Sequence, residues 1–306
     1  MRILVTGGAG FIGSNVVDML LGEGHEVAVV DNLSTGRRGN LNPKAVFYEV
    51  DIRSEELACA LRDFKPDAVD HHAAQIDVRK SVETPVYDAD VNVLGGINLL
   101  EACRSAGVRR IIYASTGGAI YGEPDYLPAD ERHPERPICH YGVSKHALEH
   151  YLYLYRHLYG LEFVALRYAN VYGPRQDPLG EAGVNAIFIG KMLAGQSPTI
   201  FGDGEQVRDY VFVEDVARAN LAALNCDSGL YVNVGTGVGT TVNEVFRAVA
   251  SAVGFDGEPI YAPQRAGEIL RVILDARLAR KVLGWKPSVS FKEGIARTVT
   301  WHRSTL

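Results

Sequence analysis

The most constraining feature of this sequence is a glycine-rich segment directly after a short apolar run at residues 3–5. Gly7, Gly10 and Gly13 follow a GxxGxxG spacing, and a helical pattern begins at Phe11. Such glycines allow a tight turn, a close approach of the backbone to a pyrophosphate, and close packing of helix on strand. The N–H groups and dipole of the helix N-terminus then favour a phosphate. The segment predicts a dinucleotide-binding strand–turn–helix unit rather than a glycine turn used only for packing.

Apolar runs and helical patterns alternate over the first two-thirds of the chain. The predicted strands are 3–5, 27–30, 46–50, 68–71, 110–114 and 163–166, and the predicted helices are 11–24, 55–64, 86–106 and 141–159. Short, continuously apolar strands separated by helices indicate a parallel sheet covered on both faces. We therefore expect an α/β fold with a Rossmann-like, doubly wound parallel sheet.

The pattern changes after residue 173. Residues 173–183 contain two prolines and three glycines, which predicts a loop. Beyond it we expect helices at 186–193, 214–224, 243–253, 278–283 and 291–302, and strands at 209–213 and 230–234. These elements predict a smaller C-terminal α/β domain that binds the substrate, formed by 173–209 and 236–306. The nucleotide-binding domain would be 1–172, with 210–235 returning to it.

Composition and charge exclude several function classes. The 306 residues carry a formal net charge of −6, from 31 basic and 37 acidic side chains. No long basic run occurs, so nucleic acid is not an expected partner. No apolar run approaches the ~20 residues of a membrane span, and the first residues lack a signal-peptide pattern, so we expect a cytoplasmic protein without membrane contact. None of the four cysteines has metal-ligand spacing; we expect free thiols and no metal site.

Asp31 is a candidate cofactor residue because it ends the second predicted strand, 18 residues after Gly13. An acidic side chain near this spacing accepts hydrogen bonds from the adenosine ribose and repels the extra phosphate of NADP. Arg37 and Arg38 follow and could host that phosphate. The carboxylate favours NAD over NADP; the alternative for Asp31 is a turn or capping role.

Tyr141 and Lys145 are candidate catalytic residues. Their spacing of four places both side chains on one face of the predicted helix at 141–159. Tyrosine, with a pKa near ~10, is a poor base at neutral pH, and a nearby ammonium together with a cationic nicotinamide would favour the phenolate. A YxxxK pattern alone is common on solvated helix faces. After a dinucleotide-binding segment it indicates acid–base catalysis.

With these two motifs the chain resembles the extended short-chain dehydrogenases/reductases, and more narrowly the UDP-glucose (UDP-galactose) 4-epimerases. Further local strings carry the resemblance nearly end to end: DNLS at 31–34, HAAQ at 72–75, YGE at 121–123, LRYANVYG at 166–173 and VRDY at 207–210. Nucleotide-sugar dehydratases, decarboxylases and uronate epimerases share much of this frame.

The resemblance implies a set of residues that bind NAD. They are Gly7, Gly10, Phe11, Ile12, Gly13, Asp31 and Asn32 at the adenosine diphosphate; Asp51 and Ile52 beside the adenine; and Ala73, Ala74, Gln75, Asn92, Tyr141, Lys145 and Tyr168 on the nicotinamide side. Tyr141 would be the acid/base, and Lys145 would tune it and bind the nicotinamide ribose.

The resemblance also implies a UDP-sugar substrate and residues that bind it. They are Thr116, Tyr141, Asn170, Val184, Arg208, Tyr210, Arg265, Glu268 and Val272. Two arginines facing a diphosphate give the charge-assisted pairing expected of such a site, although Arg208 and Arg265 could instead be surface ion-pair residues. The backbone of Gly183 and Val184 would pass along the uracil. Members of this family often pair through two helices, which implies a homodimer.

One departure from the family pattern lies beside the expected catalytic centre. The family places Ser or Thr four residues before Tyr121, and here that position is Gly117, with Thr116 one residue earlier. Either Thr116 reaches the 4-hydroxyl of the substrate, which we favour, or backbone and water take the role. The glycines at 117 and 118 also argue against a 4,6-dehydratase, which needs an acid and a base there.

The resulting hypothesis is an NAD-dependent 4-epimerase of UDP-hexoses, in which Tyr141 removes the proton of the 4-hydroxyl while hydride leaves carbon 4. The alternatives are another nucleotide-sugar enzyme, such as a uronate epimerase or decarboxylase, and a non-catalytic NAD-bound sensor. Val272, four residues after Glu268, stands where the family sets the room for the 2-substituent of the sugar. Its small side chain predicts that N-acetyl sugars are accepted, unless it merely faces the core of a strand at 271–274.

Overall fold

The computed structural model describes residues 1–178, 183–264 and 269–305. Its largest element is a seven-stranded sheet in which every strand pairs in parallel with its neighbours, in the order β10-β6-β5-β4-β1-β2-β3. The strands are β1 (Arg2–Thr6), β2 (Glu26–Asp31), β3 (Val46–Glu49), β4 (Ala68–His71), β5 (Arg110–Thr116), β6 (Glu162–Tyr168) and β10 (Leu230–Val234). The predicted doubly wound sheet is confirmed.

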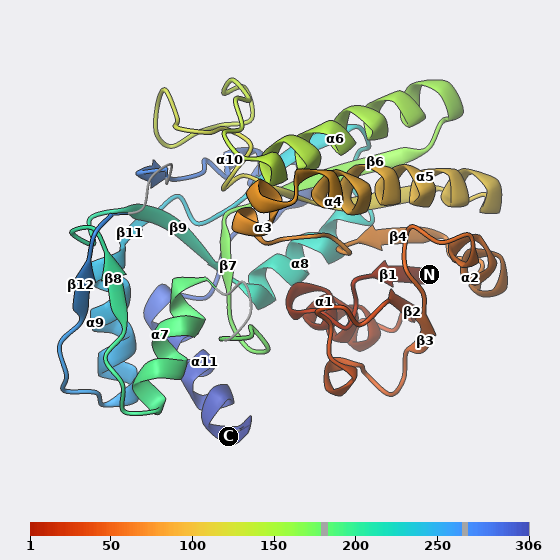
Figure 1. Cartoon of the computed structure of the whole chain (residues 1–306). Helices are drawn as coiled ribbons and strands as arrows, with labels where there is room; N and C mark the ends of the chain where they lie inside the picture. Colours follow the sequence, from red (N-terminus) through yellow and green to blue (C-terminus); the bar gives the residue numbers. More distant parts are fainter. Residues whose placement is uncertain (179–182, 265–268, 306) are drawn as a thin grey trace.

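Helices cover both faces of this sheet (Figure 1). One face carries α1 (Phe11–Gly22), α8 (Val213–Ala223) and α10 (Arg277–Leu283); the other carries α2 (Glu56–Phe64), α5 (Gly95–Ala106) and α6 (His140–Tyr159). The central strands β1, β4, β5 and β6 are buried along almost their whole length because each is sandwiched between the two helix layers. Continuous apolar strands are the expected sequence for such a position.

The residues predicted as one helix at 86–106 form three consecutive helical segments, of which the middle one is irregular. It consists of α4 (Pro85–Ala89), a π-helical segment at Asp90–Leu94, and α5. A preceding helix, α3 (Val78–Glu83), lies where the sequence pattern gave no element; Asp77 caps its N-terminus by accepting from the Arg79 and Lys80 N–H groups. Short π segments are frequent at functional sites, and this one places Asn92 in the interior.

The C-terminal part forms two small sheets and a separate apolar core. The first sheet contains β7 (Asn170–Tyr172), β9 (Val207–Phe212), β11 (Gly239–Thr241) and β13 (Arg271–Val272); the second pairs β8 (Thr199–Phe201) with β12 (Ile260–Ala262). The helices α7 (Val184–Leu193), α9 (Val242–Val253) and α11 (Phe291–Thr305) pack together beside them. A short 3-10 turn at Arg38–Asn40 completes the elements.

The chain leaves the large sheet after β6 and re-enters it at β10. Between these strands, β7 and β9 pair with each other in the small sheet, and α8 then returns to pack against α1. This path interleaves the two parts and supports, as a proposal, a division into a nucleotide-binding domain and a smaller substrate-binding domain. The strand predicted at 209–213 runs instead from Val207 to Phe212 and belongs to the small sheet.

Candidate active site

A cavity with a volume of about 820 Å³ lies at the carboxyl ends of the parallel strands. In open α/β sheets, ligands bind in the crevice outside these strand ends. Most of the residues named from the sequence line this cavity: Gly7, Gly10, Phe11, Ile12, Gly13, Asp31, Asn32, Asp51, Ile52, Ala73, Ala74, Gln75, Thr116, Tyr141, Lys145, Tyr168, Asn170 and Arg208.

The glycine turn is fixed by close backbone packing. Gly7 has φ +70°, and a Cβ there would lie 2.6 Å from the Ala73 backbone nitrogen. A Cβ on Gly13 would meet the Gly7 carbonyl. Helix α1 begins after Gly10 without any side-chain cap, which leaves its first N–H groups to a ligand. Side chains at these glycines would fill the space in the turn. The turn therefore forms an open cradle, which an anionic group fits.

Asp31 ends β2 beside this cradle and is held in place by two backbone donors. Its carboxylate accepts from the Ala9 N–H at 3.0 Å and the Leu33 N–H at 2.8 Å. Burial raises its pKa, and the two backbone hydrogen bonds oppose that shift. Asn32 donates to Asp51 at 2.8 Å, so the residues expected around adenosine and adenine form one connected rim.

Asn92 is an exception among the predicted cofactor residues, because it supports the cavity wall and does not line it. Its side chain exchanges hydrogen bonds with the backbone of Gln75, at 2.8 and 3.0 Å, and donates to the Ser144 hydroxyl at 3.1 Å. Asn92 thus ties the loop after β4 to α6. Its buried position in the π-helical segment makes this contact possible.

Tyr141 and Lys145 lie in the first two turns of α6 and both line the cavity. Burial is the main cause that raises the pKa of Tyr141; the charges of Cys139 and Asp88 act in the same direction, and a hydrogen bond with Thr116 opposes them. The groups of the chain alone therefore do not produce the lowered tyrosine pKa expected from the sequence. Because burial dominates the pKa of Tyr141, the cationic nicotinamide is the expected source of phenolate stabilisation.

Lys145 is desolvated as well. Burial lowers its pKa to about 7, while the negative charges of Asp88 and Glu149 partly counteract this. Its ammonium lies over the ring of Tyr113, 4.6 Å from the centroid, which is a favourable cation–π distance. The lysine is thus positioned by α6 on one side and by β5 on the other.

Thr116 contacts Tyr141, as the compensation expected for Gly117 requires. Gly117 is packed from the other side, because a Cβ there would enter the Leu274 side chain. Gly118 has space, since a Cβ would find nothing closer than Asn170 Oδ1 at 3.7 Å. A hydroxyl side chain at position 117 therefore requires Leu274 to move, whereas Thr116 already lies beside Tyr141.

The residues expected around the substrate are only partly brought together. Arg208 lines the cavity and donates to the Ile269 carbonyl at 2.6 Å, and Asn170 lines it at the start of β7. Tyr210 is buried in the C-terminal core against Tyr172 and Phe291. Val184 begins α7 and packs against the same core. Neither of these two lines the cavity formed by the described residues.

Val272 is also buried away from the cavity. It is 2% exposed and belongs to the core under the large sheet, while its strand β13 pairs with β9 at Arg208. This placement matches the alternative stated above, a residue facing the core. Arg265 and Glu268 lie outside the described residues.

Several cavity residues escaped the sequence analysis. They include His72, Lys80, Arg175, Gln176 and Asp177. Asp177 forms an ion pair with Arg37, so the loop after β7 reaches the loop after β2 across the cavity. The Nε2 of His72 lies 2.9 Å from Oδ1 of Asp70, and the His72 ring stacks on that of Tyr168. Of these five residues, only His72 had a sequence signal, because it directly precedes the predicted cofactor residue Ala73.

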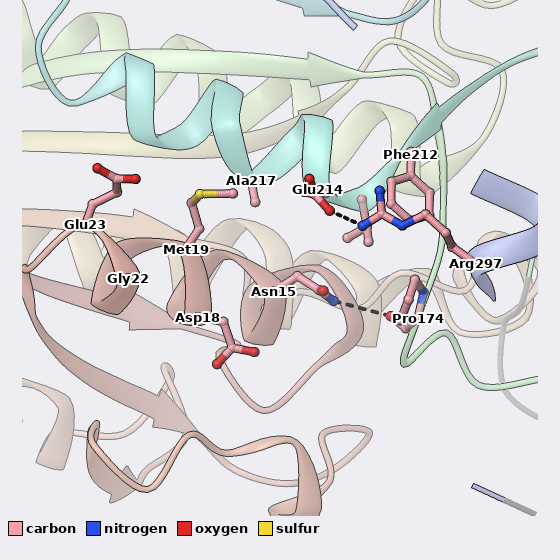
Figure 2. A pocket seen from close by; sticks show the side chains of 11 residues that line it. Asn15, Asp18, Met19, Gly22, Glu23, Pro174, Phe212, Glu214, Ala217 and Arg297 are labelled. Carbon is pink, nitrogen blue, oxygen red and sulfur yellow. Dashed lines mark hydrogen bonds and ion pairs between the residues drawn. The ribbon is translucent and has the colours of Figure 1, made fainter. Parts of the chain in front are cut away.

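A second pocket, of about 400 Å³, lies on the α1–α8 side of the molecule and is more open. Figure 2 shows its wall, where Arg297 pairs with Glu214 and Asn15 donates to the Pro174 carbonyl at 3.3 Å. These polar groups already satisfy one another. The large cavity is therefore the candidate active site.

The chain is similar over its length to known proteins. Residues 3–235 match the NAD dependent epimerase/dehydratase family. The chain is 55% identical over 302 residues to a putative UDP-glucose 4-epimerase of Methanocaldococcus jannaschii, which covers 99% of this chain and 98% of the relative. A crystal structure of the Thermotoga maritima UDP-glucose 4-epimerase with UDP-glucose is 50% identical, with a TM-score of 0.98 and coverage of 100% and 99%. The Thermus thermophilus UDP-glucose 4-epimerase complex with NAD is 51% identical, with a TM-score of 0.95 and full coverage of both chains. In the described part of the present chain, no helix is long and apolar enough to cross a membrane.

Proposed function

The chain belongs to the NAD dependent epimerase/dehydratase family, and from that premise we propose that it is an NAD-dependent 4-epimerase that interconverts UDP-glucose and UDP-galactose. The observation that carries the proposal is one cavity lined by both the glycine cradle with Asp31 and the Thr116–Tyr141–Lys145 group. A dinucleotide and a sugar hydroxyl can therefore meet at the same place. The relatives named above, which share about half of their residues with this chain, support the same activity.

NAD supplies the hydride acceptor and donor of this reaction when it is bound. The glycine cradle and the uncapped N-terminus of α1 hold its pyrophosphate, and Asp31 accepts from the adenosine ribose. A carboxylate at this position disfavours a ribose phosphate, which supports NAD over NADP. Phe11, Ile12, Asn32, Asp51 and Ile52 complete this end of the cavity.

Tyr141 is the proposed acid/base. It removes the proton from the 4-hydroxyl as carbon 4 is oxidised, and it returns a proton when the opposite face of the 4-keto sugar is reduced. Thr116 bonds to the phenol and so orients it. Lys145 lies beside the acid/base in the same cavity, with a pKa that burial lowers to about 7, and it is the proposed contact of the nicotinamide ribose.

Arg208 and Asn170 are the proposed contacts of the substrate diphosphate. Arg265 and Glu268 join them in the proposal on the family pattern alone. A tight hold on the UDP with few contacts to the hexose is what an epimerase needs, because the keto sugar must present both faces to the hydride.

A different nucleotide-sugar reaction is the second candidate, since a UDP-glucuronate 4-epimerase of Thermodesulfobacterium geofontis is also similar, at 33% identity. A uronate enzyme needs a cation for the sugar carboxylate beyond those that bind the diphosphate. Of the other arginines lining the cavity, Arg37 and Arg175 already pair with Asp177 and Asp18, and Arg53 pairs with Asp51. Lys80, which also lines the cavity, lies over the ring of Tyr87. The turnover of UDP-glucuronate therefore decides between the two candidates.

We extend the proposal to the assembly and the location. Val143, Leu154 and Leu158 are exposed on α6, and Leu94 is exposed beside them before α5. The exposed apolar residues of α6, together with Leu94 in the segment that leads into α5, support a homodimer through this side of the molecule, which light scattering on the purified protein tests. The four cysteines are unpaired, as a reducing compartment such as the cytoplasm favours.

The decisive experiment is incubation of the purified protein with UDP-galactose or UDP-glucose without added NAD. We expect the same equilibrium mixture from either side. UDP-glucuronate serves as the matched substrate control. Turnover of the uronate without turnover of either hexose would establish the second candidate. Binding of a UDP-sugar without turnover of any of them would indicate a non-catalytic NAD-bound sensor.

A further inference from the structure

The first half of α6 carries a cluster of histidines and glutamates that the proposed reaction does not use. His146 and His150 are four residues apart and therefore share one face of the helix. Their Nε2 atoms lie 3.2 Å apart, with the rings at 65° to each other. Two ligands on a tetrahedral Zn²⁺ with Zn–N bonds of 2.0–2.1 Å are about 3.3 Å apart. The spacing of the two nitrogens thus equals the spacing that a zinc ion requires.

A carboxylate approaches the same nitrogen from outside the helix. Glu135 belongs to the segment between β5 and α6, and its Oε2 lies 4.0 Å from the Nε2 of His146. Its other oxygen, Oε1, accepts from Arg167 at 2.5 Å. Oε2 faces His146, while Arg167 anchors the first oxygen. One ligand atom from each of Glu135, His146 and Glu149 lies within 4.8 Å of the others, and His150 is joined to this group through its contact with His146.

A second carboxylate approaches His146 at its other ring nitrogen, Nδ1. Glu149 is 1% exposed, and its Oε2 lies 3.5 Å from the Nδ1 of His146. Arg167 and Ser115 bind the same carboxylate, at 2.6 and 2.7 Å. Histidines that bind metals commonly donate the other ring N–H to such a carboxylate, which fixes the ring and the tautomer. Nδ1 of His146 is buried and has no well-formed hydrogen bond in the structure, so it is available for that role.

We propose that His146, His150 and Glu135 form a binding site for a divalent transition-metal ion of the zinc type, with Glu149 as the outer partner of His146. Two imidazoles and a carboxylate are ligands that suit Zn²⁺, and water would complete the tetrahedron. His150 and Glu135 are exposed in the single chain.

The site would join α6, which carries the cavity residues Tyr141 and Lys145, to the segment that leads from β5 into it. Glu135 belongs to this segment by its place in the sequence, and the path of the segment into α6 can be followed in Figure 1. A bound ion would fasten that segment to the helix one turn after Lys145. The role is structural: it holds this segment against α6 and takes no part in proton or hydride transfer.

The test is zinc titration of the full-length, tag-free protein against a chromophoric chelator, with ZnCl₂ as the only ligand. We expect one tight equivalent per chain. His146→Ala and His150→Ala should weaken binding by more than about 100-fold, beyond the 10- to 100-fold cost of losing a mere outer partner. His157→Ala is the matched control, because His157 is an exposed histidine in the last turn of the same helix. Absence of a tight equivalent, or its full retention in His150→Ala, would overturn the site.

A second readout separates binding from a folding defect. X-ray absorption of the zinc-loaded protein should show two imidazole ligands with the remaining positions filled by oxygen. Zinc should also raise the unfolding temperature of the wild type in proportion to the logarithm of its concentration, but not that of His150→Gln. A zinc spectrum with sulfur ligands would assign the ion to a cysteine site and contradict the proposal.

Discussion

Leu274 occupies the space that a side chain on Gly117 would need. Leu274 is fully buried, and a Cβ built on Gly117 enters its terminal methyl group. The absence of a hydroxyl at position 117 is therefore coupled to a leucine that lies more than 150 residues later in the sequence. The two positions form one packing unit, and Thr116 supplies the hydroxyl beside Tyr141 instead.

Gly117→Ser should destabilise the protein by about 1–3 kcal/mol, the usual cost of overpacking a core. The measurement is urea unfolding followed by circular dichroism. Gly118→Ser is the matched control, because a Cβ there finds its nearest neighbour at 3.7 Å. The cost of Gly117→Ser should shrink when Leu274→Ala is present, since contacting residues are coupled. An equal cost in both backgrounds would disprove the packing unit.

Tyr141→Phe should lower the epimerisation rate by at least about 100-fold, the lower range for acid–base catalysis, because the ring remains and the hydroxyl is lost. Binding of UDP, measured by calorimetry, should stay close to that of the wild type. Thr116→Val should give a smaller but clear loss, because it removes the hydrogen bond to the phenol. Near-normal turnover of Tyr141→Phe would mean that another group is the base.

Lys145 gives a prediction for the pH dependence of stability. Its folded pKa of about 7 is below the ordinary lysine value of 10.5. Between these values the unfolded chain binds a proton that the folded chain does not, so stability rises with pH from about 7 to 10.5. Lys145→Met removes this burial cost, which at pH 7 and below is on the order of 5 kcal/mol.

The unfolding free energy of cofactor-stripped Lys145→Met should therefore exceed that of the cofactor-stripped wild type near pH 7. The difference should narrow toward pH 10.5. Urea unfolding at several pH values provides the comparison, and Tyr113→Phe, which keeps the ring under the ammonium, serves as the control. A difference that stays constant over this range would show that Lys145 is not the titrating group.

The cofactor content of the purified protein tests the role of Asp31. Because epimerisation returns the hydride, NAD need not leave, and we expect it to co-purify. The supernatant after heat release should contain NAD(H) and little NADP(H), as enzymatic cycling assays distinguish. Asp31→Asn is the informative variant, because it keeps the shape but removes the charge that repels a ribose phosphate. Predominant NADP(H) in the wild type would contradict this role.

The nucleotide half of the site was predictable from the sequence because its signals are local. The turn at 7–13, the end of β2 at Asp31 and the four-residue spacing of Tyr141 and Lys145 each lie within one supersecondary unit. The substrate half depends on contacts between distant segments. β7, β9 and β13 are two to six residues long and pair across wide gaps in the sequence, and Asp177 reaches Arg37 from a loop. Periodicity carries no information on such pairings. The family resemblance alone placed Tyr210 and Val272 at the substrate, and both lie in cores.

The breadth of substrates remains a prediction that Val272 can test. If the small side chain leaves room for an acetamido group, UDP-N-acetylglucosamine should react within about tenfold of UDP-glucose, roughly 1.4 kcal/mol of barrier. Val272→Tyr should then depress the N-acetyl activity selectively. Because Val272 is 2% exposed, the tyrosine also overpacks the core, so unfolding free energies must accompany the rates.

Val272→Ile is the matched control for that overpacking, since it adds one methylene and no ring. A selective effect requires the ratio of N-acetyl to glucose turnover to fall in Val272→Tyr and to hold in Val272→Ile. If Val272 only fills the core beside Arg208, both substrates lose rate in the same proportion and the ratio does not move. Outright rejection of N-acetyl substrates by the wild type would show that other residues close the pocket, because valine at position 272 is too small to do so.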